Sequence, residues 1–175
     1  MVSGPIGAAY GGMIDRIVDV KPHDAIRATK NLSYRETYLR DHFPGFPLMP
    51  GAMQLECMIQ AGQWLLRVSH EFPPCDFFPR VVKNTRYSRF VIPGDSLEVE
   101  VSITKTEGDR TAFKGEGRVD GAKTIVARFE LVRYEPTWTR ALHSPEEAAR
   151  MIQKLQSSFR RLREGALPMF TGASL

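Results

Sequence analysis

The sequence predicts an α+β fold, in which a curved antiparallel sheet of about six strands wraps around one long central helix and an extra helix follows at the C-terminus. Three observations predict it. Residues 52–68 form a helix-favouring segment with apolar side chains on nearly every side, residues 97–134 have the pattern of an antiparallel meander, and an amphipathic segment follows Pro136. A helix that is apolar all round is buried, so the sheet must cover it.

Length and composition limit the chain to one core. Its 175 residues suit a single domain over residues 1–135 with an extension over residues 136–175. The composition is 42% hydrophobic and 25% charged, and no apolar run reaches the roughly 18 residues of a membrane span. The first residues lack the basic start and apolar stretch of a secretory signal, so we expect a cytoplasmic protein.

Charge and cysteine content argue against several classes of function. The net charge is +4, and most of the excess lies in residues 136–175, which carry six Arg and Lys against three Glu. Without a zinc-finger or basic-zipper pattern, nucleic-acid binding is not expected, although a positive surface would attract an acidic partner. Cys57 and Cys75 lack metal-ligand spacing, so we expect free thiols and no metal site.

Two short strands and a stiff loop precede the central helix. Residues 14–20 and 25–32 are rich in branched side chains and flank a turn-prone segment. The loop 41–51, DHFPGFPLMPG, has three prolines and two glycines, which forbid a regular helix or a central strand. Such a loop holds its side chains in place.

The meander follows the central helix. Residues 71–79, EFPPCDFFP, end the helix and lead into three further strands. In the first of them, apolar residues alternate with polar ones from Leu97 to Thr104, which gives one face to the core and one to water. Turns at 107–109 and 120–121 then connect strands over 111–119 and 124–134. Sheets of this kind often pair edge to edge.

The C-terminal extension predicts an amphipathic helix over about residues 144–164. Ser144, Pro145 and Glu147 have the spacing of a capping box with proline in the first turn, and Gly165 is a plausible stop. An apolar stripe runs along it, formed by Met151, Ile152, Leu155, Phe159 and Leu162. We favour packing of this stripe on the domain or on a neighbouring subunit over nucleic-acid or membrane binding.

Glu56 is unusual because it lies in the helix that is predicted to be buried. Burial disfavours a charged carboxylate, so Glu56 is a candidate general acid. The alternative is a carboxylate on a narrow polar stripe with Gln60 and Gln63, paired with a basic group or facing water. On the helix alone, the second interpretation is the better supported.

His42 is the second candidate for chemistry. It begins the proline-rich loop, and an imidazole titrates in the range that a base needs near neutral pH. The loop ends where the helix carrying Glu56 begins, and backbone amides at a helix N-terminus can polarise a carbonyl oxygen without a metal. This pairing favours His42 over the other histidines.

Residues 42–60, HFPGFPLMPGAMQLECMIQ, resemble the signature of the hotdog-fold 3-hydroxyacyl-[acyl carrier protein] dehydratases of bacterial fatty-acid synthesis, in particular the FabZ type. The His, three Pro, two Gly and Glu of the signature fall at the family's spacing. The resemblance covers residues 13–134 and includes Asp15-Arg16, VIPGDSLEVEVSI at 91–103 and GRVDGAKTIVARFEL at 117–131. It implies a hotdog fold.

The resemblance also implies roles for individual residues. His42 would be the catalytic base and Glu56 the acid, and in this family the two come from different subunits of a homodimer. The backbone N–H of Gly51 would polarise the thioester carbonyl, and the Leu48 carbonyl would orient the imidazole. A β-hydroxyacyl thioester would then lose its α proton and its hydroxyl group as water.

Further residues and partners follow from the same resemblance. Substrate contacts are expected from three residues of the signature, namely Phe43, Pro50 and Gln60. The substrate would be a thioester of acyl carrier protein or of coenzyme A, and no cofactor is needed. The expected assembly is a homodimer with shared active sites, and a trimer of dimers stays open.

Two other classes of function stay open. One is a different hotdog enzyme, either a hydratase or a thioesterase acting on coenzyme A thioesters. The other is a non-catalytic acyl-binding protein that retains the fold. Glu at position 56, where the bifunctional dehydratase/isomerase relatives have Asp, argues against double-bond isomerisation.

Overall fold

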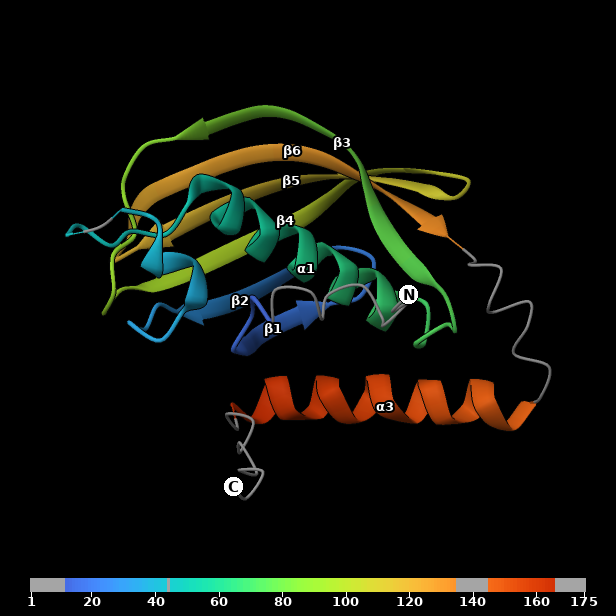
Figure 1. Cartoon of the computed structure of the whole chain (residues 1–175). Helices are drawn as coiled ribbons and strands as arrows, with labels where there is room; N and C mark the ends of the chain where they lie inside the picture. The colour runs from blue at the N-terminus through green and yellow to red at the C-terminus, as the bar shows by residue number, and fades with distance from the viewer. Residues whose placement is uncertain (1–11, 44, 135–144, 166–175) are drawn as a thin grey trace, which may run out of the picture.

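A single antiparallel sheet curls around one long helix in the computed structural model, which describes residues 12–43, 45–134 and 145–165 (Figure 1). The helix is α1 (Gly51–Ser69). The sheet has the order β1-β2-β4-β5-β6-β3, and each neighbouring pair is antiparallel. Its strands are β1 (Arg16–Lys21), β2 (Ala25–Asn31), β3 (Asp76–Tyr87), β4 (Ser96–Glu107), β5 (Arg110–Val119) and β6 (Ala122–Tyr134). The predicted α+β hotdog architecture is therefore confirmed.

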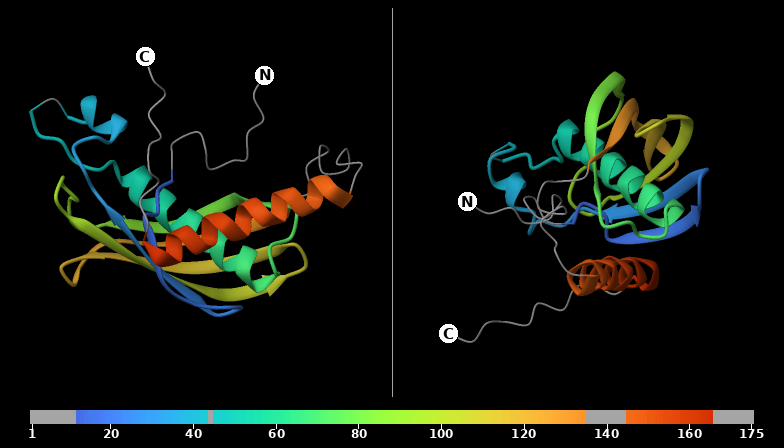
Figure 2. Two further views of the ribbon diagram at one scale, coloured as in Figure 1. Left: turned by 90° about the horizontal axis from the view of Figure 1, so that it is seen from below. Right: turned by 90° about the vertical axis from the view of Figure 1, so that its right-hand side faces the viewer.

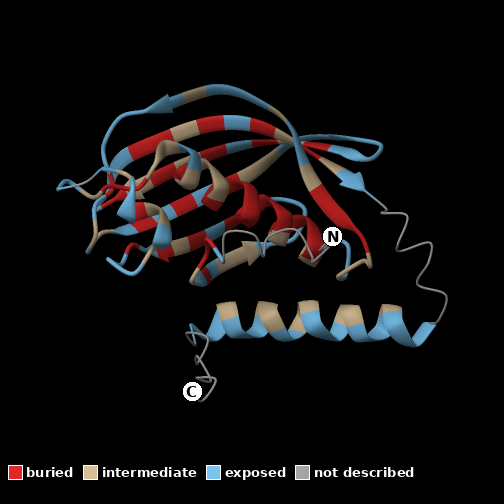
Figure 3. Ribbon diagram, viewed as in Figure 1, coloured by how far each residue is buried: buried red, intermediate tan, exposed pale blue. Residues whose placement is uncertain are grey.

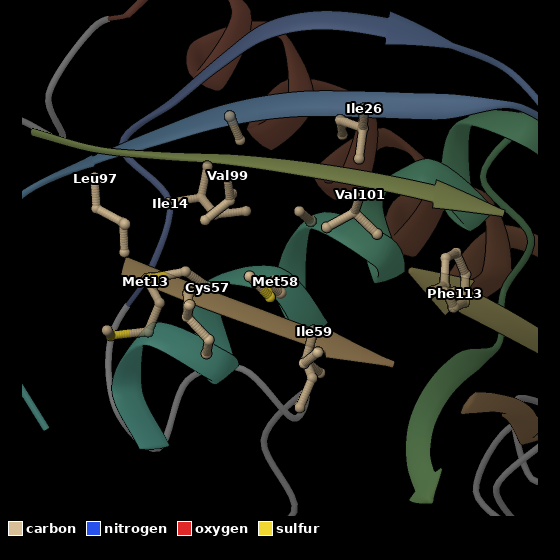
Figure 4. Packing of buried hydrophobic residues seen from close by; sticks show 14 of the residues in the cluster. Met13, Ile14, Ile26, Cys57, Met58, Ile59, Leu97, Val99, Val101 and Phe113 are labelled. Carbon is tan, nitrogen blue, oxygen red and sulfur yellow. The ribbon is translucent and has the colours of Figure 1, made fainter. Parts of the chain in front are cut away.

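The core lies between α1 and the inner face of the sheet (Figure 4). On β4, Leu97, Val99 and Val101 are buried while the residues between them are exposed, as the alternation predicts. Cys57 and Met58 of α1 are fully buried against this face. Burial of this apolar area is the main stabilising contribution to the fold.

Polar residues of α1 are buried as well, because they find partners inside the fold. The side-chain amide of Gln63 donates to the Phe77 carbonyl over 2.7 Å. Arg67 pairs with Asp76 at 2.9 Å, and both side chains are less than a tenth exposed. The polar stripe of Glu56, Gln60 and Gln63 is therefore present on α1, and its two glutamines form hydrogen bonds with other protein groups.

Strand β3 corrects the prediction for residues 71–79. The sequence predicts a break there that leads into three strands, whereas the chain enters β3 at Asp76 and stays extended to Tyr87. Beyond Phe77 the strand is mostly exposed, because it lies at the edge of the sheet, and its register shifts on either side of Val82. Pro79 lies inside the strand, which an edge position tolerates. These features hide the alternation by which strands are recognised.

The C-terminal helix α3 (Pro145–Glu164) lies along β1, on one side of the sheet (Figures 1 and 2). It begins at the predicted Pro145 and is followed by Gly165, whose φ is +69°. Ser144 lies outside the described residues. One side of α3 is half-buried and the other is exposed (Figure 3).

Aromatic contacts hold α3 against the domain. The ring of Phe159 lies 6.1 Å from that of Trp64 on α1 and 5.5 Å from that of Phe72. Arg163 donates to the carbonyl oxygen of Val18 on β1 over 3.1 Å. The apolar stripe thus contacts the domain of its own chain.

Two further expectations concern thiols and membranes. Cys57 and Cys75 are free, as expected, and both are buried. Among the described residues, no helix has the length and apolar character to span a membrane.

Candidate active site

The loop that carries His42 follows a short 3-10 helix, η1 (Thr37–Arg40), and is held by its own backbone. The N–H of Leu48 donates to the His42 carbonyl over 3.1 Å, and Phe43 and Phe46 exchange backbone hydrogen bonds of 3.3 and 3.0 Å. These bonds fold the loop back on itself. The predicted stiffness of the loop therefore has a structural basis beyond its prolines.

A further bond fixes the loop to the rest of the fold. The N–H of Met49 donates to the carbonyl of Val91 over 2.8 Å, and both side chains are buried. The loop is thereby anchored between the segment before β4 and the beginning of α1.

The imidazole of His42 is half-buried and stacks on the ring of Phe43, with 4.3 Å between the ring centroids. The bond between His42 and Leu48 joins the Leu48 N–H to the His42 carbonyl. Within the described residues, no hydrogen bond of the imidazole to the Leu48 carbonyl occurs, so that role of Leu48 stays a prediction.

The N-terminus of α1 presents a free backbone donor. Pro50 is the N-cap residue and has no side chain that could satisfy the first amides. Its carbonyl accepts from the N–H groups of Met53 and Gln54, at 2.9 and 3.2 Å. In the described part of the chain, the N–H of Gly51 has no acceptor, so it is available to an oxygen of a ligand.

Tyr87, the last residue of β3, covers this helix N-terminus. A Cβ atom at Gly51 would lie 2.7 Å from Cε1 and 2.8 Å from Cζ of the Tyr87 ring. Those distances are too short for any real side chain, so glycine at position 51 allows the phenol to approach the backbone.

Glu56 lies about one turn and a half into α1 and is half-buried. Its Oε1 accepts a hydrogen bond of 2.9 Å from the side-chain amide of Gln60. The Oε1 of Gln60 in turn accepts the backbone N–H of Met13 over 2.9 Å. Gln60 therefore fixes the carboxylate of Glu56 and ties it to the segment before β1.

An ion cluster lies where the segment before β1 meets β2. Lys30, whose side chain is 7% exposed, contacts Glu36 at 2.7 Å and Asp15 at 3.3 Å. Burial lowers the pKa of Lys30, but the hydrogen bond and charge of Glu36 and those of Asp15 outweigh it, so the pKa is raised. Glu36 directly precedes η1, so the cluster links the segment that leads to His42 with the segment that contacts Gln60.

Cys57, the neighbour of Glu56, is not suited to nucleophilic chemistry. Burial raises the pKa of its thiol far above the usual range, and the nearby charge of Glu56 acts in the same direction. The thiolate is the reactive form of cysteine, so Cys57 is a packing residue at neutral pH.

The structure thus brings some predicted site residues together and leaves others apart. Glu56 and Gln60 are directly bonded, and the loop of His42 runs into Gly51 through Pro50. No ion pair or hydrogen bond joins the side chains of His42 and Glu56 within the described chain. The same residues include no group of three or more His, Cys, Asp or Glu that could hold a metal ion.

The sequence did not single out Tyr87. The reason is that β3 was not recognised as a strand, so no residue of it was expected near the helix N-terminus. A signal was present in Gly51, since a glycine at the first position of a helix indicates a close neighbour as well as a turn.

Comparisons with known proteins agree on the type of domain. Residues 8–130 match the model of the FabA-like domain. Curated relatives include the 3-hydroxyacyl-[acyl-carrier-protein] dehydratase FabZ of Shewanella sp. (strain W3-18-1), 36% identical over 127 residues, which are 70% of this chain and 82% of the relative. The enzyme of the same name from Yersinia enterocolitica is 32% identical over 71% of this chain and 75% of its own.

Solved structures show the same fold at low identity. A chain of the dehydratase heterocomplex ApeI:P from Xenorhabdus doucetiae matches with a TM-score of 0.59 and 16% identity, over 75% of this chain and 90% of that one. A hot-dog-like protein from Thermanaerovibrio acidaminovorans matches with a TM-score of 0.56 and 17% identity, over 70% and 89% of the two chains.

Proposed function

Because the chain belongs to the FabA-like family and is a FabZ-type hotdog dehydratase, we propose that its active site joins His42 of one subunit to Glu56 of a second. The protein is an enzyme that dehydrates 3-hydroxyacyl thioesters of acyl carrier protein to trans-2-enoyl thioesters in fatty-acid synthesis.

The proposed chemistry needs a base, an oxyanion donor and an acid. The imidazole of His42 takes the α proton of the substrate, and the electron pair moves onto the thioester oxygen. The N–H of Gly51 holds the resulting negative charge. When the double bond forms, the β-hydroxyl leaves with a proton from Glu56 as water. Transfer of the proton from His42 back to Glu56 through solvent restores the starting state.

The observation that carries this proposal is the N–H of Gly51, which has no acceptor among the described residues and lies where the loop of His42 meets the helix of Glu56. The loop is braced by the Met49–Val91 bond, and the carboxylate is braced by Gln60. Groups that are held in place before the reaction stabilise the charge that develops in the transition state, and they thereby lower the activation barrier.

A homodimer supplies the missing contact between base and acid. Edge strand β3 has one side without a partner strand in the described chain, and Val82 is a large apolar side chain exposed on it. Four more exposed apolar residues lie in the loop of His42 and in the segment after β3, namely Phe43, Phe46, Phe90 and Ile92. Pairing of two β3 edges would cover apolar surface of this kind and bring two copies of the site together.

Basic residues that neighbour His42 or Tyr87 in the sequence fit an acidic carrier protein. Arg40, Arg86 and Arg89 are exposed close in sequence to His42 or Tyr87. Charges of one sign around a site attract an oppositely charged partner and speed its association. Phe43 and Pro50 are the residues that we expect to contact the acyl thioester as it enters.

The test is a dehydration assay on purified protein with 3-hydroxyacyl thioesters of acyl carrier protein and of coenzyme A. We expect interconversion with the trans-2-enoyl product, and loss of turnover in His42→Ala and in Glu56→Gln without unfolding. Glu98→Gln, which changes an exposed carboxylate on β4, is the matched control and should keep full activity. Full activity of either site variant, or release of free thiol in place of dehydration, would overturn the proposal.

A further inference from the structure

The phenol ring of Tyr87 lies against Gly51, whose N–H is the proposed donor to the thioester oxygen. Cζ, the atom that carries the hydroxyl group, is 2.8 Å from the position of a Cβ on Gly51. That position is bonded to the Cα of Gly51, which also carries the N–H that the proposed mechanism uses as oxyanion donor. The ring that carries the hydroxyl group therefore lies against the backbone of the residue whose amide is the proposed oxyanion donor.

The hydroxyl group of Tyr87 is available as a donor. Its side chain is 49% exposed, and in the described part of the chain the hydroxyl has no hydrogen-bond partner. Burial of the rest of the ring raises its pKa, so the O–H stays protonated at neutral pH. A protonated phenol can donate to an oxygen that gains negative charge.

Pairing of β3 with β6 holds the backbone that carries the Tyr87 side chain. Tyr87 pairs with Ile125, whose side chain is fully buried in the core, so Tyr87 faces the same side of the sheet as α1. The backbone of the next residue is also held, since the N–H of Ser88 donates to the Thr124 carbonyl over 2.8 Å.

From these observations we propose that the Tyr87 hydroxyl is a second hydrogen-bond donor to the thioester oxygen, acting beside the N–H of Gly51. The inference rests on the dehydratase mechanism proposed above. Two donors that converge on one oxygen stabilise an enolate more than either alone, and the interaction strengthens as the charge develops. Glycine at position 51 is what allows the phenol to approach.

The test compares Tyr87→Phe with the wild-type enzyme on a 3-hydroxyacyl thioester of acyl carrier protein. Phenylalanine keeps the ring against Gly51 and removes only the hydroxyl group. We expect kcat to fall about 10²-fold, as for loss of one oxyanion donor elsewhere, with KM nearly unchanged. The unfolding midpoint and the mass in solution should match those of the wild type.

Tyr134→Phe is the matched control, because it removes an exposed phenol at the end of β6 that packs against Phe78. Its kcat should equal that of the wild type. An unchanged kcat in Tyr87→Phe, or a change in KM alone, would overturn the role of Tyr87 and leave the dehydratase mechanism standing. A wild-type enzyme without dehydration activity would overturn the mechanism itself and the inference with it.

Discussion

Gln60 donates a 2.9 Å hydrogen bond to the carboxylate of Glu56, one helical turn away on the same face of α1. Because the other end of the Gln60 amide accepts the N–H of Met13, the glutamine cannot rotate without losing a bond. The proposed acid is thus held by a residue that is itself held by the chain before β1.

Gln60→Met should lower both stability and activity. It removes both bonds and leaves the buried Met13 N–H without a partner, which costs about 1–3 kcal/mol of unfolding free energy. The freed Glu56 side chain should lower kcat by about 10-fold or more, since correctly placed acid catalysis contributes on the order of 10²–10⁴. Denaturant unfolding and steady-state kinetics measure the two effects.

Gln63→Met is the control, because Gln63 is another buried glutamine of α1 whose partner is the Phe77 carbonyl. It should lose a similar amount of stability and keep its kcat. Equal kcat values in the two variants would show that Gln60 acts only on the fold.

Lys30→Met should destabilise the protein through the Asp15–Lys30–Glu36 cluster. Removing the cation leaves two carboxylates facing one another in a mostly buried site, which costs on the order of 3 kcal/mol. Because the folded-state pKa of Lys30 is raised, its contribution is complete below its ordinary pKa of 10.5 and declines as the pH rises through the higher folded value. Chemical denaturation at neutral and alkaline pH measures it.

Lys105→Met tests the same change at the surface. Lys105 and Glu107 are each about two-thirds exposed, so solvent screens their pair and its loss should change the free energy of unfolding little. If the two lysine variants lost equal stability, the buried cluster would have no special role.

Acid should destabilise the protein through His70. Burial, and then the positive charges of His23 and Arg133, lower the pKa of His70 below 6.5. A lowered pKa means that the native state favours the neutral imidazole, so its stabilisation is present above pH 6.5 and is lost as the pH falls through the folded-state value. The unfolding free energy of His70→Gln should therefore fall less steeply between neutral and mildly acidic pH. Identical pH slopes in the two proteins would contradict this assignment.

Phe159→Ala should loosen α3 from the domain. The substitution removes the ring contacts with Trp64 and Phe72, which are together worth about 1–2 kcal/mol. Hydrogen exchange should become faster along α3, and kcat should not change, because residues 136–175 are proposed to be an appendage of the dehydratase domain over residues 1–135. Ser157→Ala, at an exposed position of the same helix, should leave the exchange as it is in the wild type. Unchanged exchange in Phe159→Ala would show that another contact holds α3.

Local sequence patterns predict those elements that one continuous stretch of the chain determines. The alternation in β4, the apolar composition of α1 and the prolines of the His42 loop each reflect a local physical rule. Strand β3 escaped because its edge position leaves it exposed and mixed in composition. Contacts such as those of Gln60 with Met13, or of Tyr87 with Gly51, join distant parts of the chain, and no local pattern encodes them.

A mixing experiment tests the shared site most directly. Subunits of His42→Ala and Glu56→Gln, each inactive alone, are exchanged, and the formation of mixed dimers is verified by mass. Each mixed dimer has one site with both His42 and Glu56 intact, so random pairing should restore about one quarter of the wild-type rate. A mixture that forms mixed dimers and stays as inactive as its components would contradict a site built from two subunits.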